Sequence, residues 1–233
     1  MIYYYDLHIH SVLSACADDL MTPNNIFNMA NLKGLNIISV TDHNSLKQLL
    51  ICHEISESYD MLFIPGVEVS VSEGYHILVY FKHIEDAVKF DHILEKHINK
   101  KTYDIQFFGE QQLVDIHDEM IDYYPYLLSP NLSISLEALK KELEQYEHLI
   151  FYAHVDRTKH SGLENIQHDA LDGIELTMGC DDHFIDLHNL SGYPKIYNSD
   201  AHQIVDILEK TEKNQIDLIE LSIDEFFRYF NHG

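Results

Sequence analysis

Strand-like and helix-like segments alternate along this chain, and this alternation limits the folds that it can adopt. The run IYYYDLH at residues 2–8 is typical of a strand, and LNIISVT at residues 35–41 is typical of a buried strand. Between them, Thr22 and Pro23 predict the start of a helix that ends at Gly34. Such alternation predicts an α/β fold with a mostly parallel sheet or barrel.

The pattern continues to the C-terminal part of the chain with one interruption. Further strands are expected near 61–70, 75–81, 148–154, 173–177 and 194–200, the first two forming a hairpin. The intervening residues, about 84–147, have helical periodicity, including a helix near 110–121, and hold no candidate ligand. We therefore expect one domain over residues 1–233 with a helical insert at about 84–147.

Acidic and imidazole side chains collect near the ends of these strands. Alternate residues of a strand share a face, so His8 and His10 point the same way, with Asp6 behind them. The other strand ends carry Asp42, His43, Glu68, His76, His154, Asp200 and His202. Most lie at the C-terminal edge, where parallel barrels build their active sites. Histidines and carboxylates without a thiolate suit zinc, manganese or iron.

The charge balance bears on the partners. The net charge of −24, from 15 basic and 39 acidic residues, argues against electrostatic capture of long nucleic acid or of an anionic membrane. Three separated cysteines indicate reduced thiols, and a strand that begins near residue 2 leaves no room for a signal peptide. No apolar run approaches the roughly 18 residues of a membrane span. We therefore expect a cytoplasmic protein.

Taken in order, the motifs DLHIHS, TDHN, GVE, a lone histidine, AHVDR and SDAH resemble those of the PHP family (polymerase and histidinol phosphatase). The resemblance runs from Asp6 to His202. It implies a distorted (β/α)7 barrel with its metal site at the C-terminal edge of the strands. It also implies two to three divalent ions and hydrolysis of phosphate esters by a hydroxide that bridges the metals.

The resemblance also implies a ligand set. One ion would be held by His8, His10, Glu68 and Asp200. A second would be held by Asp18, His43 and His202. A third would be held by His76 and His154, with Glu68 bridging it to the first.

The ligand in the loop after the first strand has two candidates. The family often has Ser-Asp-Gly before a Ser-Pro or Thr-Pro, and this chain has CADDLMTP. Both Asp18 and Asp19 fit this position, and we favour Asp18 because it lies five residues before Pro23.

Two residues are candidates for catalysis, Arg157 and Asp42. Arg157 is one of two arginines, and in AHVDR it corresponds to an arginine that the family often has, suited to bidentate phosphate binding. Its alternative role is a salt bridge to a loop carboxylate. Asp42, like Asp6, either orients a ligand imidazole or is a structural polar residue.

Lys159 and His160 are further candidates for substrate binding. The predicted function is a metal-dependent phosphoesterase that acts on a small phosphorylated metabolite or nucleotide, with no long nucleic acid and no membrane as partner. Trimming of short RNA or nucleotide ends is the second reading. The hypothesis of a non-catalytic regulatory metal-binding domain is disfavoured because the set of ligand positions is complete. An amidohydrolase would be expected to carry a barrel lysine near a strand end, and the middle of this chain has none.

Overall fold

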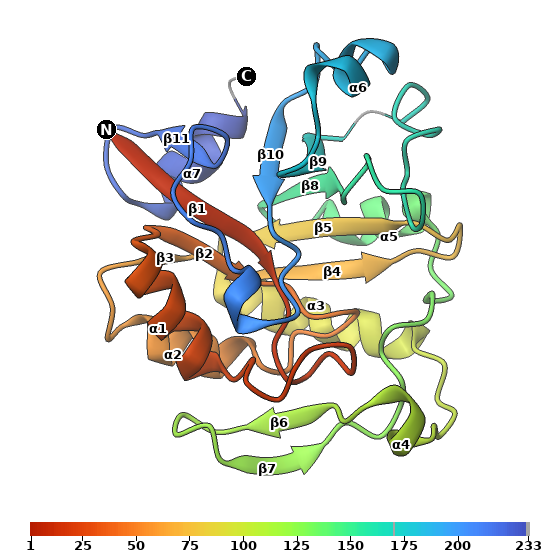
Figure 1. The fold of residues 1–233 in the computed structure, drawn as a ribbon. Coiled ribbons are helices and arrows are strands. Elements are labelled where there is room, and N and C mark those ends of the chain that lie inside the picture. The colour runs from red at the N-terminus through yellow and green to blue at the C-terminus, as the bar shows by residue number, and fades with distance from the viewer. Residues whose placement is uncertain (170, 232–233) are drawn as a thin grey trace.

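The structure is a computed structural model that describes residues 1–169 and 171–231, and its architecture is mixed α/β (Figure 1). The strands are β1 (Ile2–Ile9), β2 (Ile37–Val40), β3 (Leu62–Phe63), β4 (Gly66–Ser70), β5 (His76–Phe81), β6 (Gln112–Val114), β7 (Met120–Tyr123), β8 (His148–Tyr152), β9 (Gly173–Thr177), β10 (Lys195–Asn198) and β11 (Gln215–Asp217). The helices are α1 (Pro23–Lys33), α2 (Leu49–Ser56), α3 (Ile84–His97), α4 (Ile105–Phe108), α5 (Leu136–Leu143), α6 (Asp182–Leu187), α7 (Ile223–Asn231) and a 3₁₀ helix at Ile204–Asp206. Within the described residues, no helix has the length and apolar character that crossing a bilayer requires.

One sheet, of order β11-β1-β2-β3, contains the strand that carries the first histidine motif. β1 pairs in parallel with β2, and β2 pairs in parallel with β3. The connection between β1 and β2 contains α1, as parallel pairing requires. α1 starts at Pro23 and ends at Gly34, whose φ of 73° closes the helix in the left-handed region. The predicted helix is therefore confirmed, and its Ile26 and Phe27 are fully buried.

A second sheet, of order β10-β9-β8-β5-β4, supplies the remaining strand ends. β8, β9 and β10 run parallel to one another, whereas β5 runs antiparallel to both β4 and β8. The predicted hairpin is confirmed as β4–β5, and its turn contains Gly74 with a φ of 98°.

The strands do not close into the barrel that the resemblance implied. Within the described residues the two sheets are joined by isolated bridges, Ile9 with Ala201 and His43 with Glu68. Where β10 meets β1, the backbone N–H of Leu7 donates to the Asn198 side chain, at 2.9 Å. β10 and β1 thus form no strand ladder among the described residues, and β11 pairs with β1 on the edge opposite β2. The fold is mixed α/β, and a closed (β/α)7 barrel is not confirmed.

The insert at 84–147 contains α3 and α5 towards its two ends and the short helix α4 between them. The helix expected near 110–121 is replaced by the antiparallel pair β6–β7. The carboxylate of Asp115 accepts from the backbone N–H groups of His117 and Glu119, at 2.8 and 3.0 Å, and Asp118 has a φ of 61°. This turn chemistry competes with helix formation, which explains the difference from the predicted helix.

Candidate metal centre

Most of the predicted ligands converge where the two sheets meet. His8 lies on β1 and His10 just after it, whereas His43 follows β2. The second sheet and the segments that follow it contribute Glu68, His76, His154, Asp200 and His202. All but His202 and Asp200 are buried, and these two are partly exposed. Residues far apart in the sequence thus form one cluster of imidazoles and carboxylates.

The first group contains the pair from the opening motif. The Nε2 atoms of His8 and His10 lie 3.1 Å apart, and Asp200 Oδ1 lies 3.2 and 3.0 Å from them. The Glu68 carboxylate is 3.4 Å from each of the two nitrogens. Ligand atoms bound at about 2.1 Å to one tetrahedral ion lie roughly 3 to 3.5 Å apart, so this spacing suits a divalent cation.

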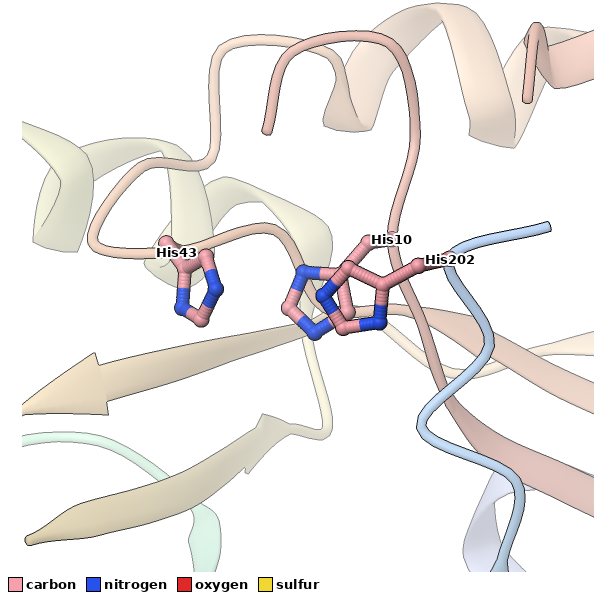
Figure 2. Close-up of side chains that lie close together, drawn as sticks. All are labelled: His10, His43 and His202. Atoms are coloured by element: carbon pink, nitrogen blue, oxygen red, sulfur yellow. The ribbon is translucent and has the colours of Figure 1, made fainter. Parts of the chain in front are cut away.

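The second group brings together three histidines from three separate segments, as Figure 2 shows. The rings of His10 and His202 are stacked with centroids 4.3 Å apart, and the centroids of His10 and His43 are 4.4 Å apart. One nitrogen of each of the three lies within 4.8 Å of the others. His43 and His202 therefore meet as predicted, next to the first group.

Glu68 connects these groups to the remaining histidines. Its Oε1 lies 2.8 Å from Nδ1 of His76 and 3.1 Å from Nε2 of His154, and its Oε2 lies 2.8 Å from Nδ1 of His43. Burial would raise the pKa of the Glu68 carboxyl, but the surrounding histidines lower it well below its usual value. Glu68 is thus an anionic carboxylate in contact with several imidazoles.

Two buried imidazole nitrogens of this cluster lack a hydrogen-bond partner among the described residues: His76 Nε2 and His154 Nδ1. An unpaired buried polar atom is costly, whereas neutral imidazole and carboxylate are ligands of divalent metals. The donor set therefore fits divalent ions.

The sequence analysis missed Glu175, a buried residue in the middle of β9. Its carboxylate lies 2.9 and 3.1 Å from Nδ1 of His8 and accepts from the backbone N–H of His154 at 2.7 Å. It also accepts from the Asn198 side chain at 2.8 Å. Burial would lower the pKa of His8, but Glu175, Asp200 and Glu68 raise it well above its usual value. The sequence feature that could have revealed Glu175 is an acidic residue inside the otherwise apolar strand GIELT.

The structure does not bring Asp18 into the cluster. Asp18 and Asp19 are exposed, and the Asp18 carboxylate accepts from the backbone N–H of Leu20 at 2.9 Å. The backbone N–H of Asp18 does reach the site, where it donates to the His202 carbonyl at 2.8 Å. The thiol of Cys16 in the same loop interacts with His43 and His202. Burial would raise the pKa of this thiol, but His202 and His43 lower it to about 7.

Asp6 and Asp42 lie behind the ligands and hold the segments that carry them. The Asp6 carboxylate accepts from the Ser199 hydroxyl at 2.7 Å and from the backbone N–H of Leu208 at 3.0 Å. Asp42 accepts from the hydroxyls of Ser11 and Ser14, at 2.6 and 2.7 Å.

The Asp42 contact extends to a ligand histidine, because the Ser14 hydroxyl lies 3.1 Å from Nδ1 of His10. Asp42 therefore contacts His10 only through Ser14, and it is not among the residues that line the adjacent pocket.

A pocket of about 610 Å³ opens over the cluster. Arg157, Lys159 and His160 border it, so the three predicted substrate-binding residues lie beside the ligands. The Arg157 guanidinium donates to the Asp200 carboxylate, and the His160 ring stacks on His76 with centroids 4.5 Å apart. A salt bridge to a carboxylate, the alternative role for Arg157, is thus present, and its partner is a candidate ligand.

No family model matches this sequence. An uncharacterized protein from Methanocaldococcus jannaschii is 27% identical over 77 residues, which are 30% of this chain and 45% of that protein. The lesion-specific Endonuclease Q from Pyrococcus furiosus has a TM-score of 0.74 at 22% identity, over 100% of this chain and 57% of its own. A Bifidobacterium adolescentis protein described as a metal-dependent phosphoesterase has a TM-score of 0.57 at 16% identity, over 98% of this chain and 96% of its own.

These comparisons correct the expected partners. Endonuclease Q has also been solved with a 27-mer duplex that carries an abasic lesion at the active site, and this complex has a TM-score of 0.69 at 19% identity. This complex shows duplex DNA bound to that neighbour, which contradicts the expectation of a small phosphorylated partner and no long nucleic acid. The net charge of −24 is an average over the whole chain, whereas phosphate binding depends on the local charge beside the site.

The chain spans about half the length of the archaeal relative that it matches and of Endonuclease Q. Its motifs, its converging ligands and its structural neighbours agree on one conclusion. The chain has the fold of Endonuclease Q and of the metal-dependent phosphoesterase, which supports the PHP-type family that its ordered motifs resemble.

Proposed function

We propose that this protein hydrolyses phosphodiester bonds of a nucleic acid with the help of divalent metal ions. The observation that carries the proposal is the position of Glu68, whose carboxylate contacts His43, His76 and His154 below a pocket bordered by Arg157. A dense set of metal ligands beside a fixed cation is suited to binding and cleaving a phosphoester.

In this proposal one set of residues holds the metal ions and a second set binds the phosphate. His8, His10, Glu68 and Asp200 would hold one ion, with His43 and His202 at a second and His76 and His154 at a third. When bound, divalent ions activate water as a nucleophile at neutral pH and neutralise charge on the phosphoryl oxygens. Arg157 and Lys159 bind and orient the phosphate at the mouth of the pocket, through a planar guanidinium fork and a mobile ammonium.

A nucleic-acid substrate is favoured over a small metabolite by two features. One structural neighbour, Endonuclease Q, has been solved with a DNA duplex that carries an abasic lesion at the active site. The pocket border also concentrates Arg157 and Lys159 on one loop, in a chain with only 15 basic residues. Cations at the border of one pocket can contact one segment of nucleic-acid backbone, whereas an acidic chain does not attract DNA over its whole surface.

The experiment is elemental analysis of protein purified without chelator, followed by cleavage assays in zinc, manganese or ferrous iron. The substrates are a labelled duplex with an abasic site, the intact duplex, the single strand and bis(p-nitrophenyl) phosphate. We expect metal-dependent cleavage of at least one nucleic acid, abolished in His8→Ala and retained in His188→Ala, which changes a histidine outside the cluster. Product lengths distinguish internal cleavage from trimming of ends. Metal-loaded protein that cleaves none of these substrates would contradict the proposal.

A further inference from the structure

Among the residues that the structure describes, one residue of the insert lines the pocket over the candidate metal centre. This residue is Ser129, in the segment between β7 and α5. It borders the same pocket as Arg157 and Lys159, which follow β8 and lie far from it in the sequence. The insert therefore contributes to the surface that a substrate would contact.

The side chain of Asn44 fixes the position of Ser129. Its Nδ2 donates to the carbonyl of Leu128, at 2.5 Å, and to the carbonyl of Pro130, at 3.0 Å. These two residues stand on either side of Ser129 in the sequence. Asn44 directly follows the candidate ligand His43, so the segment that contains Ser129 is tied to the backbone beside a ligand.

The side chain of Gln111 holds the residues that lead to this position. Its Oε1 accepts from the backbone N–H of Leu128, at 2.8 Å. Its Nε2 donates to the carbonyls of Tyr124 and Tyr126, at 3.3 and 2.7 Å. The amides of Gln111 and Asn44 are both fully buried, and burying an amide costs free energy unless it is hydrogen-bonded. Here the bonds that satisfy the two amides also fix the segment in place.

Ser129 itself has donors that its neighbours do not use. The residue is exposed, and neither its hydroxyl nor its backbone N–H has a hydrogen-bond partner within the described part of the chain. The lining residues that are not candidate ligands share one property, since each can donate a hydrogen bond: Ser129, Arg157, Thr158, Lys159 and His160. Apart from the candidate ligands, no acidic residue among those described lines the pocket.

A pocket wall made of donors is complementary to a ligand that is rich in acceptors. Phosphate oxygens are anionic acceptors, and hydroxyls and backbone N–H groups are frequent partners of the phosphates of nucleic acids. A hydrogen bond to a charged acceptor is also stronger than one between neutral groups. Because the segment is already fixed, little conformational entropy is lost when it binds a ligand.

We propose that Ser129 binds a phosphate oxygen of the substrate through its hydroxyl and its backbone N–H, and that Asn44 positions Ser129 for this contact. The inference rests on the proposed function and adds a substrate-binding residue from the insert to those on the loop after β8. Asn44 contacts no substrate and acts through the carbonyls on either side of Ser129.

The test is the affinity of Ser129→Ala for a labelled duplex that carries an abasic site. Fluorescence anisotropy of the metal-loaded full chain gives Kd, and a gel confirms that the duplex stays intact. Loss of a hydrogen bond to a charged group predicts a Kd that is raised on the order of 10-fold. Ser129→Thr keeps the hydroxyl and should retain affinity. Ser191→Ala changes an exposed serine outside the pocket and is the matched control.

Two further measurements distinguish this contact from other roles of Ser129. Metal content should match the wild type, and a loss of affinity that accompanies a loss of metal would overturn the contact. In the cleavage assay, Ser129→Ala should raise KM more than it lowers kcat, because the bound phosphate is charged in the ground state as well as in the transition state. Wild-type affinity in Ser129→Ala, or an equal loss in Ser129→Thr, would also overturn the proposal.

A double-mutant cycle tests the positioning role of Asn44. Asn44→Gly removes the amide, and glycine readily adopts the φ of 54° that Asn44 has. If Asn44 acts through Ser129, adding Ser129→Ala to Asn44→Gly should weaken binding much less than Ser129→Ala does in the wild type. Independent losses would show that Asn44 does not position Ser129. Ser129→Ala alone decides the contact if Asn44→Gly fails to fold.

The same data separate this inference from the proposed function. Affinity for the duplex that depends on Ser129, in a protein that cleaves no phosphodiester, would support the contact and overturn the proposed function. Metal-dependent cleavage with no effect of Ser129→Ala on Kd or KM would overturn the contact and leave the proposed function intact. A wild-type protein that does not bind the duplex would overturn the contact as well.

Discussion

Oε1 of Glu175, on β9, lies 2.9 Å from Nδ1 of His8, on β1, and both side chains are buried. This contact leaves Nε2 of His8 directed at His10, Asp200 and Glu68. A carboxylate on one ring nitrogen fixes the orientation of the imidazole and makes its other nitrogen a better metal ligand. Glu175 therefore acts on the candidate metal centre through His8.

The contact predicts that Glu175→Gln weakens metal binding without removing a ligand. The expected loss of affinity is about 10- to 100-fold, as for other groups that orient ligand histidines. Metal titration of the chelator-treated protein, with competition by a chromogenic chelator, measures it. Glu137→Gln changes an exposed glutamate and serves as the control. Equal affinities in the two variants would show that Glu175 only fills space behind His8.

Removing the central carboxylate should cost more than one ion. Glu68 contacts histidines assigned to different ions, so Glu68→Gln is expected to lower the metal content by more than one ion per chain. His154→Ala removes a ligand from one position and should lower it by one at most. Elemental analysis of both variants makes the comparison. A similar content in the two would show that Glu68 does not bridge.

The thiol of Cys16 should be reactive in metal-free protein at neutral pH. Because His202 and His43 lower its pKa to about 7, the thiolate fraction, and with it the rate of alkylation by iodoacetamide, should rise as the pH increases through 7. Cys52 is buried and its pKa is raised, so it should stay unmodified. Mass spectrometry of the alkylated peptides follows each site.

The effect of added metal on this alkylation then tests whether Cys16 or Asp18 is the ligand in this loop. If the sulfur binds the ion at His43 and His202, metal protects Cys16 from alkylation. The cobalt-substituted protein should then show a thiolate charge-transfer band that Cys16→Ser abolishes and Asp18→Asn retains. If Cys16 stays reactive in the metal-loaded protein, Asp18 is favoured as the ligand. Because Asp18 is exposed, the loop would then have to change conformation to bring its carboxylate to the ion.

Arg157→Lys should separate phosphate binding from ligand orientation. Lysine keeps the charge but loses the bidentate fork, so KM for the cleaved substrate is expected to rise on the order of 10-fold with a smaller change in kcat, since a hydrogen bond to a charged group contributes roughly 1.5–3 kcal/mol. Steady-state kinetics and metal content are measured together. A fall in metal content with unchanged KM would mean that Arg157 serves only to hold Asp200, with which it pairs.

His43→Ala should affect turnover instead. His43 contacts both Glu68 and the His10–His202 pair, so its loss should lower kcat on the order of 100-fold or more. Full turnover in His43→Ala would show that the reaction does not require His43. His117→Ala, in the turn of the β6–β7 hairpin, is the control.

Much of the candidate site was predictable from the sequence because its signals are local. His8 and His10 share a face by the period of two in a strand, and His43, His154 and Asp200 follow strands that pattern alone identifies. The start and end of α1 were equally predictable, since Pro23 and Gly34 act through their own backbone geometry. The order of these motifs along the chain was sufficient to indicate the family.

Tertiary structure decided what depends on contacts between distant segments. Glu175 approaches His8 only because the sheet that contains β9 meets the sheet that contains β1 at this site, and where β10 approaches β1 the Asn198 side chain accepts from the backbone N–H of Leu7. Turn contacts around Asp115 made β6–β7 a hairpin where helical periodicity predicted a helix. Sequence by itself determined which side chains could bind metal and in what order. Which of them meet was decided by packing, since its free energy depends on the whole fold and not on neighbours in the chain.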